Sequence, residues 1–226
     1  MAAVKMDEFL MQIMTGTQNP DSQVGAVILA AGTSTRMGQA KQLLPLDGST
    51  VLARTIDNVR AAGLVEIVLV LGAAAESIRR QLPSPLLNGL KVVVNQAYAQ
   101  GMASSLREGL SALDLQTAAA LIVLGDQPFI RPQTLHQIIG EYHRSGSQIV
   151  IPAYQGQRGN PVLLSRQLFP EVMALKGDTG CRAIFPNHLD ATLKVEVEDS
   201  GILLDIDNPE DYDRLLREQH PPRIDE

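Results

Sequence analysis

The stretch that decides the fold is Val24-Gly-Ala-Val-Ile-Leu-Ala30, which runs directly into Ala31-Gly-Thr-Ser-Thr-Arg-Met-Gly-Gln-Ala-Lys41. The first part contains only apolar side chains and one glycine, a composition typical of a strand buried on both faces of a parallel sheet. The second part combines glycines, whose backbone N–H groups can approach an anion closely, with the cations Arg36 and Lys41. The stretch therefore predicts a first strand followed by an anion-binding loop.

Short apolar runs of this kind recur along the chain and alternate with amphipathic stretches. The expected strands are 24–30, 67–71, 91–94, 119–124, 149–151 and about 193–197. The expected helices are 50–62, 74–81, 103–113, 132–144 and one from about Pro209. This alternation predicts a doubly wound α/β fold, with a mostly parallel sheet between two layers of helices. Ligands in such sheets bind beyond the carboxyl ends of the strands, so functional residues should follow strands.

The bulk composition limits the classes of protein to which the chain can belong. Its 226 residues, 45% of them hydrophobic, suffice for one full-sized core, so we expect a single domain over residues 24–219. A formal net charge of −6 argues against a nucleic-acid-binding protein, which needs a basic face. The single cysteine, Cys181, suits a reducing compartment. No apolar run is long enough to cross a bilayer, and we expect a cytoplasmic protein without membrane contact.

The two ends of the chain are expected to lie outside this domain. Residues 1–23 lack the basic start and the cleavage pattern of a signal peptide, and we interpret them as an N-terminal extension. Residues 220–226 are interpreted as a C-terminal tail.

The loop after the first strand matches neither of two common nucleotide-binding motifs. It lacks the Gly-Lys-Ser/Thr of the Walker A motif, and Gly32 and Gly38 are too far apart for the dinucleotide fingerprint. On composition alone, Gly32 could simply turn the chain. The pattern Leu-Ala-Ala-Gly-x-x-x-Arg-Met-Gly-x-x-Lys, however, resembles the signature of the nucleotidyltransferases that include the molybdenum cofactor cytidylyltransferases. The resemblance implies a Rossmann-like nucleotidyltransferase fold and a loop that holds a nucleoside triphosphate.

A second motif, Gly125-Asp-Gln-Pro128, follows the apolar run 121–124. An aspartate at the end of a buried strand suits Mg²⁺, which takes few carboxylates and bridges triphosphate oxygens. The alternative is that Asp126 caps the next helix or forms an Asx turn. The resemblance favours the first interpretation, because in the family this segment supplies the metal-binding aspartate.

A third motif, Asp205-Ile-Asp-Asn-Pro-Glu-Asp211, leads into the last expected helix. In an extended segment Asp205 and Asp207 point to the same side, so one or both could complete a magnesium site with Asp126. We favour Asp205. Asp207 is equally well explained by the helix start that Asn208 and Pro209 indicate.

The resemblance also assigns residues to the two substrates. It places the helix entry at Gly101 against the nucleotide base, with Ser104 and Ser105 as hydrogen-bonding candidates, although small residues are ordinary at a helix N-terminus. The acceptor side is expected from Arg158, Asn160, Asp178 and Arg182, whose guanidinium groups suit a phosphate. Asp178 could equally be a helix N-cap. The full expected nucleotide-binding set is Leu29, Ala30, Ala31, Gly32, Arg36, Lys41, Gly101, Ser104, Ser105 and Asp126, with Arg36, Lys41 and Asp126 as the catalytic residues.

The resemblance implies an enzyme that transfers CMP from CTP to the terminal phosphate of the molybdenum-molybdopterin cofactor and releases pyrophosphate. The resemblance also favours CTP over GTP. Guanylyltransferase relatives have the pattern Leu-Ala-Gly-Gly, with glycine at the position of Ala31 in this chain. The methyl group of Ala31 leaves less room beside the base. The expected cofactor is Mg²⁺, with Mn²⁺ left open. The expected recipient of the product is a molybdenum enzyme or its maturation chaperone.

Three alternatives stay open from the sequence. The first is a cytidylyl- or uridylyltransferase that acts on a sugar or polyol phosphate. The second is a non-catalytic carrier or insertion protein for the molybdenum cofactor, which would not need both a triphosphate loop and a metal site. The third is a dinucleotide-dependent dehydrogenase, which the glycine spacing disfavours.

Overall fold

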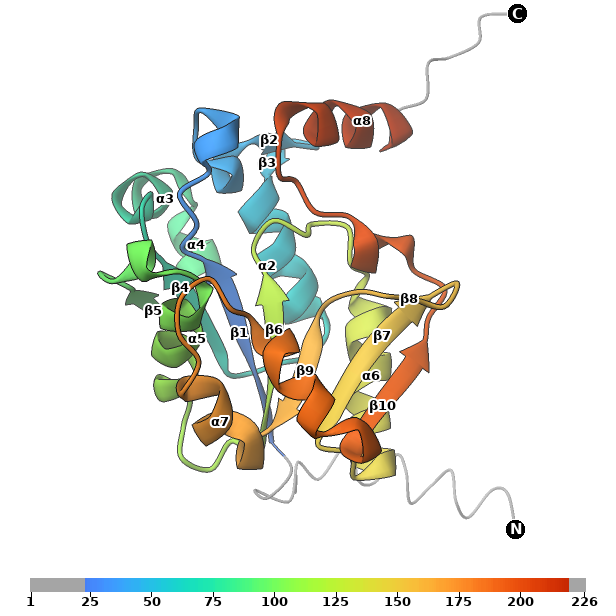
Figure 1. The fold of residues 1–226 in the computed structure, drawn as a ribbon. Coiled ribbons are helices and arrows are strands. Elements are labelled where there is room, and N and C mark those ends of the chain that lie inside the picture. The colour runs from blue at the N-terminus through green and yellow to red at the C-terminus, as the bar shows by residue number, and fades with distance from the viewer. Residues whose placement is uncertain (1–22, 220–226) are drawn as a thin grey trace, which may run out of the picture.

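The structure is a computed structural model, and it describes residues 23–219. Most of the predicted N-terminal extension, up to residue 22, and the predicted tail from His220 lie outside the described residues. The described chain is built on a central sheet of eight strands (Figure 1). Seven strands follow one another in the order β10-β7-β9-β6-β1-β4-β5, and β8 pairs with β7 alone.

The strands agree closely with the expected apolar runs. Their bounds are β1 Val24–Ala30, β4 Ile67–Leu71, β5 Leu90–Val94, β6 Ala119–Leu124, β7 Ile149–Tyr154, β8 Gln157–Arg158, β9 Val162–Ser165 and β10 Thr192–Glu196. A separate hairpin consists of β2 Pro45–Leu46 and β3 Ser49–Thr50. β1 lies in the middle of the sheet, parallel to both β4 and β6, which explains why its side chains are apolar on both faces.

Four strands were not expected from the sequence: the two-residue strands β2, β3 and β8, and the longer β9. β9 runs antiparallel to both of its neighbours, β6 and β7, and it separates two parallel parts of the sheet. Its four residues, Val-Leu-Leu-Ser, are all buried, but the run is short and follows the turn residues of 155–161. A run of this length does not separate a strand from a buried turn by periodicity.

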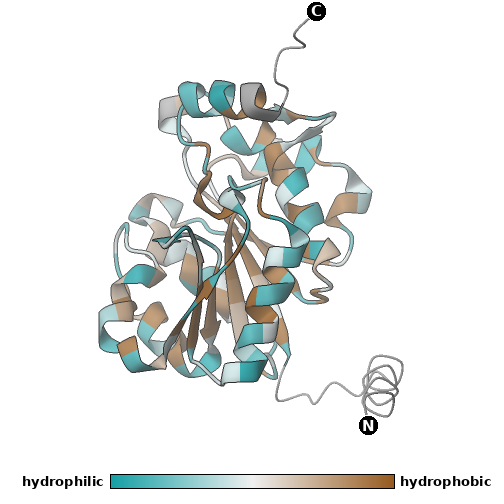
Figure 2. Ribbon diagram, turned by 90° about the vertical axis from the view of Figure 1, so that its right-hand side faces the viewer, coloured by the Kyte–Doolittle hydropathy of each residue, from teal (hydrophilic) through white to brown (hydrophobic). Residues whose placement is uncertain are grey.

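Helices cover both faces of the sheet, so the doubly wound prediction is confirmed. The helices are α2 Val51–Ala61, α3 Ala75–Gln81, α4 Ser84–Leu87, α5 Met102–Ser111, α6 Pro132–Ser145, α7 Phe169–Met173 and α8 Pro209–Gln219. Figure 2 shows apolar strands between helices whose outward turns are hydrophilic. No helix within residues 23–219 is long and apolar enough to cross a membrane.

Two large apolar clusters fill the space between the sheet and the helices. Alternate residues of β1 divide between them: Ile28 packs with α2 and α6, whereas Val27 packs with α5 and α7. A third, small cluster joins Leu44 and Leu46 of the hairpin region to Leu215 of α8. This cluster also contains Ile206 and anchors α8 beside the hairpin (Figure 1), and Asp207 then reaches Lys41, in the segment that follows β1.

Candidate active site

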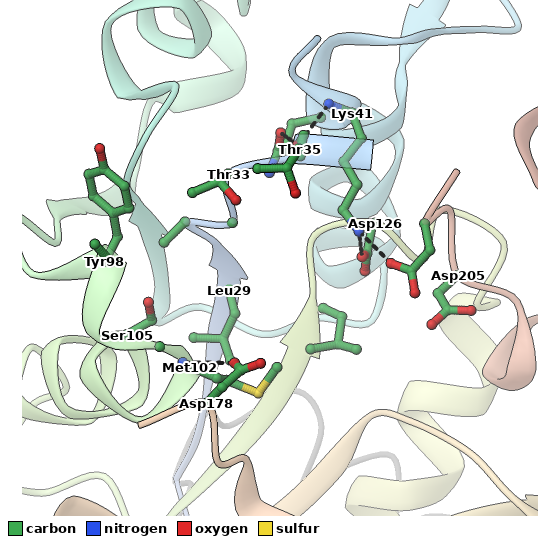
Figure 3. Close-up of a pocket in the computed structure, with 18 residues that line it drawn as sticks. Leu29, Thr33, Thr35, Lys41, Tyr98, Met102, Ser105, Asp126, Asp178 and Asp205 are labelled. Carbon is green, nitrogen blue, oxygen red and sulfur yellow. Dashed lines mark hydrogen bonds and ion pairs between the residues drawn. The ribbon is translucent and has the colours of Figure 1, made fainter. Parts of the chain in front are cut away.

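A cavity of about 640 Å³ opens at the carboxyl edge of the sheet (Figure 3). Its walls come from the loop after β1, the end of β6, the entry to α5 and two segments near the C-terminus. The lining residues are Leu29, Ala31, Gly32, Thr33, Ser34, Thr35, Lys41, Gln42, Tyr98, Ala99, Gly101, Met102, Ser105, Leu124, Asp126, Asp178, Asp205 and Asp207. The tertiary structure therefore brings together most of the residues that sequence motifs selected, from positions far apart in the chain.

The loop after β1 is held in shape by its own side chains. The Ser34 hydroxyl accepts a hydrogen bond from the backbone N–H of Lys41 at 3.2 Å and donates to Gln42 Oε1 at 3.4 Å. Gln42, only 2% exposed, in turn donates to the carbonyl of Ala30 at 3.3 Å. Ser34 adopts a left-handed conformation with φ of 51°. The loop is thus closed on itself before any ligand binds.

The cavity side of this loop is open around Gly32. A Cβ atom built on Gly32 has no neighbour within 4 Å, so the fold itself does not require glycine there. Space beside a backbone N–H is what a phosphate oxygen needs for close approach. The backbone of Arg36 belongs to a short 3-10 turn, Thr35–Met37. The predicted role of the Arg36 side chain lies outside what the structure describes.

Lys41 is the centre of the charged part of the site. Its Nζ atom lies 2.5 Å from Asp126 Oδ2 and 2.9 Å from Asp207 Oδ1 (Figure 3). Burial disfavours the ammonium ion and lowers the pKa of Lys41, but attraction to Asp126 and the hydrogen bonds to Asp126 and Asp207 outweigh it, so the pKa is raised. Lys41 is therefore a permanent cation at neutral pH.

The carboxylates beside Lys41 are only partly compensated. Asp126 Oδ1 is buried and has no hydrogen-bond partner among the described residues. Asp205 is exposed on one side, and its pKa is raised first by partial desolvation and then by repulsion from Asp207 and Asp126. A buried carboxylate oxygen without a partner is costly unless a ligand satisfies it. An additional cation at this place would compensate both carboxylates.

This donor set fits a magnesium ion that is bound together with a substrate. Within residues 23–219, no group of three or more His, Cys, Asp or Glu side chains is arranged to hold a metal alone. Mg²⁺ does not require such a group, because it commonly takes one or two carboxylates and completes its coordination with water and substrate phosphates. Asp126 and Asp205 are the residues that would hold it. Asp207 instead contacts Lys41, while Asn208 caps α8 by accepting from the N–H of Asp211 at 2.8 Å.

The two serines at the start of α5 differ in what they offer to a ligand. Ser105 lines the cavity, as expected. Ser104 does not: it is 3% exposed, and its hydroxyl bonds to the carbonyls of Ala97 and Gly101 at 3.0 and 2.8 Å. Ser105 is itself only 5% exposed, so the difference lies in the hydroxyl partners: those of Ser104 are carbonyls inside the protein, and Ser105 is the one of the two that lines the cavity. The structure thus separates a pair that the sequence could not rank.

The predicted acceptor residue Asp178 lies at the same end of α5. Its carboxylate accepts from the N–H of Met102 at 3.3 Å, and the carbonyl of Gly177 accepts from Ala103 at 3.2 Å. A Cβ on Gly101 would come within 2.4 Å of Gly177, so glycine is needed for this contact. Asp178 therefore accepts from the first N–H of α5 and also lines the cavity, and its role toward the acceptor stays a prediction.

The other predicted acceptor residues do not line this cavity. Arg158, on β8, stacks over the Phe185 ring with its guanidinium carbon 4.9 Å from the ring centroid. Burial and the nearby positive charge of Arg182 lower the pKa of Arg158. Neither arginine forms a salt bridge within the described chain. Asn160 donates its backbone N–H to the carbonyl of Ile202 at 3.0 Å.

Several residues at the cavity carried no recognisable signal in the sequence. Gln42, Tyr98 and Met102 line it, and Asn95 supports it from beneath. Cys181, in contrast, is no catalyst, because burial raises the pKa of its thiol to about 12 and keeps it protonated. Of these residues, only Asn95 could have been selected from the sequence, because it follows a strand directly and polar residues in that position are expected at this edge of the sheet.

Comparison with known proteins identifies the family to which the chain belongs. The model of the MobA-like NTP transferase domain matches residues 26–192. The chain belongs to this family. It is a nucleotidyltransferase of the MobA-like type, and divalent metals are common in such enzymes.

Several known proteins match most of this chain. The molybdenum cofactor cytidylyltransferase of Escherichia coli is 28% identical, over 84% of this chain and 94% of that protein. The nicotine blue oxidoreductase of Paenarthrobacter nicotinovorans is 30% identical, over 85% and 96%. Among solved structures, Rv0371c from Mycobacterium tuberculosis, 35% identical, gives a TM-score of 0.77 and covers 87% of this chain and 99% of its own. A complex of Rv0371c with manganese gives a TM-score of 0.74 at 34% identity, covering 86% and 98%.

Proposed function

We propose that this nucleotidyltransferase transfers CMP from CTP to the terminal phosphate of the molybdenum-molybdopterin cofactor, forming the cytosine dinucleotide and releasing pyrophosphate. One observation carries the proposal: Lys41 lies between Asp126 and Asp207 at the mouth of an open glycine loop, and Asp126 keeps an unpartnered buried oxygen. The similarity to the Escherichia coli cytidylyltransferase supports the choice of substrates.

The residues divide the work of binding the triphosphate. The open space around Gly32 leaves room for phosphate oxygens to approach the backbone of this loop, and the ammonium of Lys41 supplies a fixed positive charge. Asp126 and Asp205 would hold Mg²⁺, which when bound neutralises charge that develops on the phosphates. Arg36 is proposed to bind the phosphates as well.

The chemistry needs no general base from the protein. An oxygen of the acceptor phosphate attacks the α-phosphorus of CTP, one P–O bond forms, and the bond to the bridging oxygen of the β-phosphate breaks. A phosphate monoester has a second pKa near 6, so this nucleophile is already an anion at neutral pH. The task of the site is in-line placement and stabilisation of the departing pyrophosphate, for which Lys41 is positioned.

We assign the acceptor to Asp178, which lines the cavity, and to Arg158, Asn160 and Arg182, which lie outside the cavity lining. Arg158 and Arg182 are like-charged neighbours without a carboxylate partner in the described chain, and such a pair is relieved by an anion. The terminal phosphate of the pterin cofactor is an anion of this kind.

Ala31 supports a pyrimidine base. Ala31 lines the cavity and packs closely against Gly72. A Cβ atom added to Gly72 would lie only 2.8 Å from the Cβ atom of Ala31. With the methyl group fixed in this way, the space beside the base is smaller than a glycine would leave.

The test is pyrophosphate release measured over a matrix of nucleoside triphosphates and phosphorylated acceptors, with Mg²⁺ and with Mn²⁺. We expect turnover with CTP and the molybdenum cofactor. Preferential turnover of GTP would contradict the base assignment. Turnover with a sugar or polyol phosphate would replace the acceptor assignment, and cofactor binding without pyrophosphate release would indicate a carrier.

A further inference from the structure

Asn95 is a buried amide directly behind the wall of the cavity that the start of α5 forms. It follows β5 and is 1% exposed. Its Nδ2 donates to the hydroxyl oxygens of Ser104 at 2.7 Å and Ser105 at 3.0 Å, and its Oδ1 accepts from the backbone N–H of Ala97 at 2.8 Å. A backbone N–H can only donate, so this last bond fixes which end of the amide faces the serines.

This orientation decides the direction of the two hydroxyl protons. A serine hydroxyl has one proton, and both oxygens already accept from Asn95. The Ser104 proton has two carbonyl acceptors, those of Ala97 and Gly101. No acceptor for the Ser105 proton is found anywhere in residues 23–219. Ser105 lines the cavity, and Figure 3 shows its hydroxyl directed into that space.

We propose that Asn95 is a positioning residue that makes the Ser105 hydroxyl a hydrogen-bond donor to the bound nucleobase. The ligand group recognised is an acceptor on the base, either a ring carbonyl oxygen or an unprotonated ring nitrogen. This inference deepens the proposed function and rests on it, because it presumes that the base lies against α5. The proton cannot turn back toward Asn95, whose two N–H bonds occupy that side.

Two substitutions change this arrangement in different ways. Ser105→Ala removes the donor. Asn95→Asp keeps an acceptor for the N–H of Ala97 but replaces the donating amide by a carboxylate, which accepts from the serines and draws the Ser105 proton away from the cavity. Ser104→Ala is the matched control, because its hydroxyl is bound to carbonyls inside the protein.

The experiment compares affinities for CTP and for ribose 5-triphosphate, which has no base, by calorimetry with Mg²⁺ and without acceptor. For Ser105→Ala we expect CTP affinity to fall about 3- to 10-fold, the usual effect of one neutral hydrogen bond, with ribose 5-triphosphate unchanged. Asn95→Asp should lower the CTP to ribose 5-triphosphate ratio at least as much. Ser104→Ala should lower the melting temperature and leave the ratio at its wild-type value.

The ratio separates positioning from stability, because a variant that is merely loosened loses affinity for both ligands equally. Wild-type ratios in Ser105→Ala or in Asn95→Asp would overturn the inference. Binding of ribose 5-triphosphate shows that the Asn95→Asp variant is folded. If this variant does not bind ribose 5-triphosphate, the ratio measured for Ser105→Ala decides whether the inference stands. If the wild-type protein prefers GTP to CTP, the proposed function is contradicted but this inference is not. The ratio of affinities for GTP and ribose 5-triphosphate then tests Ser105 in the same way.

Discussion

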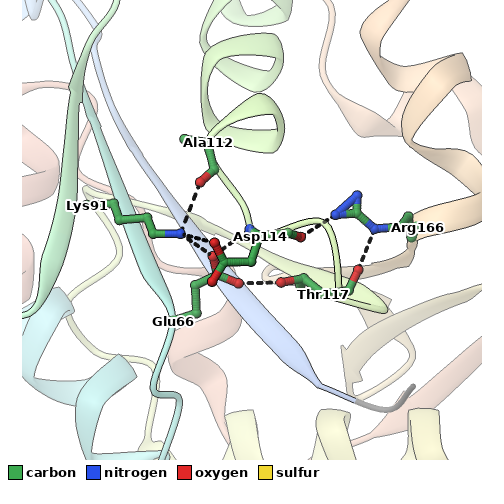
Figure 4. Close-up of polar contacts among 6 residues, drawn as sticks. All are labelled: Glu66, Lys91, Ala112, Asp114, Thr117 and Arg166. Atoms are coloured by element: carbon green, nitrogen blue, oxygen red, sulfur yellow. Dashed lines mark hydrogen bonds and ion pairs between the residues drawn. The ribbon is translucent and has the colours of Figure 1, made fainter. Parts of the chain in front are cut away.

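The two edges of the central sheet each hold a carboxylate with at least one buried oxygen, and the surrounding residues satisfy these two groups to different extents. At the amino edge, Glu66 precedes β4 and is 6% exposed, and both of its oxygens are satisfied (Figure 4). Oε1 accepts from Lys91 at 2.8 Å and from the N–H of Asp114 at 2.7 Å, and Oε2 accepts from the Thr117 hydroxyl. At the carboxyl edge, Asp126 has one ionic partner and one oxygen with none in the described chain.

This difference separates a structural carboxylate from one that is prepared for a ligand. The hydrogen bonds of Glu66 connect the 112–118 turn to β4 and β5. Arg166 holds the same turn by donating to the carbonyls of Thr117 and Asp114. Incomplete satisfaction of Asp126 costs stability, because a buried polar atom is left without a partner. A site that binds a cation bears this cost in its ligand-free state, and the cation removes it.

The largest expected effect distinguishes the two edges directly. Asp126→Asn should reduce the rate of pyrophosphate release about 100-fold or more, because it removes charge where the transferred phosphates are neutralised. Its melting temperature should change little, because Asp207 still pairs with Lys41 and the amide fills the same space as the carboxylate. Steady-state kinetics and calorimetry measure the two quantities. Near-normal turnover would reject the metal-binding role of Asp126.

The reverse result is expected at the amino edge. Glu66→Ala should lower the free energy of unfolding by about 2 to 3 kcal/mol, because it leaves the buried donors of Thr117 and Asp114 without acceptors. Turnover per folded molecule should stay close to the wild-type value. Denaturant unfolding, together with kinetics below the transition, tests this. A loss of turnover without a loss of stability would mean that the two edges are coupled.

Gly32 and Gly101 sharpen the comparison within the carboxyl edge. Gly32→Ala should raise the KM for the nucleotide about tenfold through hindered phosphate approach, with stability unchanged or slightly higher, because no atom lies within 4 Å of the new Cβ. Gly101→Ala is the matched contrast: with φ of 98° and a backbone neighbour at 2.4 Å, it should destabilise the fold. Equal melting temperatures for the two variants would contradict this assignment.

The smallest effect concerns pH. The pKa of Lys41 is raised in the folded protein, so its contribution to stability is complete below the unfolded-state pKa and is lost as pH rises through the folded-state pKa. The difference in unfolding free energy between wild type and Lys41→Met should therefore be constant from about pH 6 to 9 and shrink only at strongly alkaline pH. Denaturant titrations at several pH values measure it. A difference that already shrinks near neutrality would show that Asp126 and Asp207 do not hold the ammonium.

The sequence by itself determined the strands with strong apolar runs, and with them the carboxyl edge at which the loop of β1, Asp126 and Asp205 would meet. These features are local: a buried strand needs apolar side chains on both faces, and a phosphate loop needs glycine and cations in one short segment. The order of the motifs along the chain was enough to predict the fold class.

Only the tertiary structure decided the features that depend on distant partners. β9 is a strand because β6 and β7 leave it a place between them, and its own four residues are too short to show it. Asp207 contacts Lys41 across 166 positions in the sequence, and Asp178 caps a helix 76 positions away. Ser104 and Ser105 look alike in sequence and both accept from Asn95, but only Ser104 has two carbonyl acceptors within reach. Hydrogen-bond partners are set by proximity in space, which no local pattern of residues encodes.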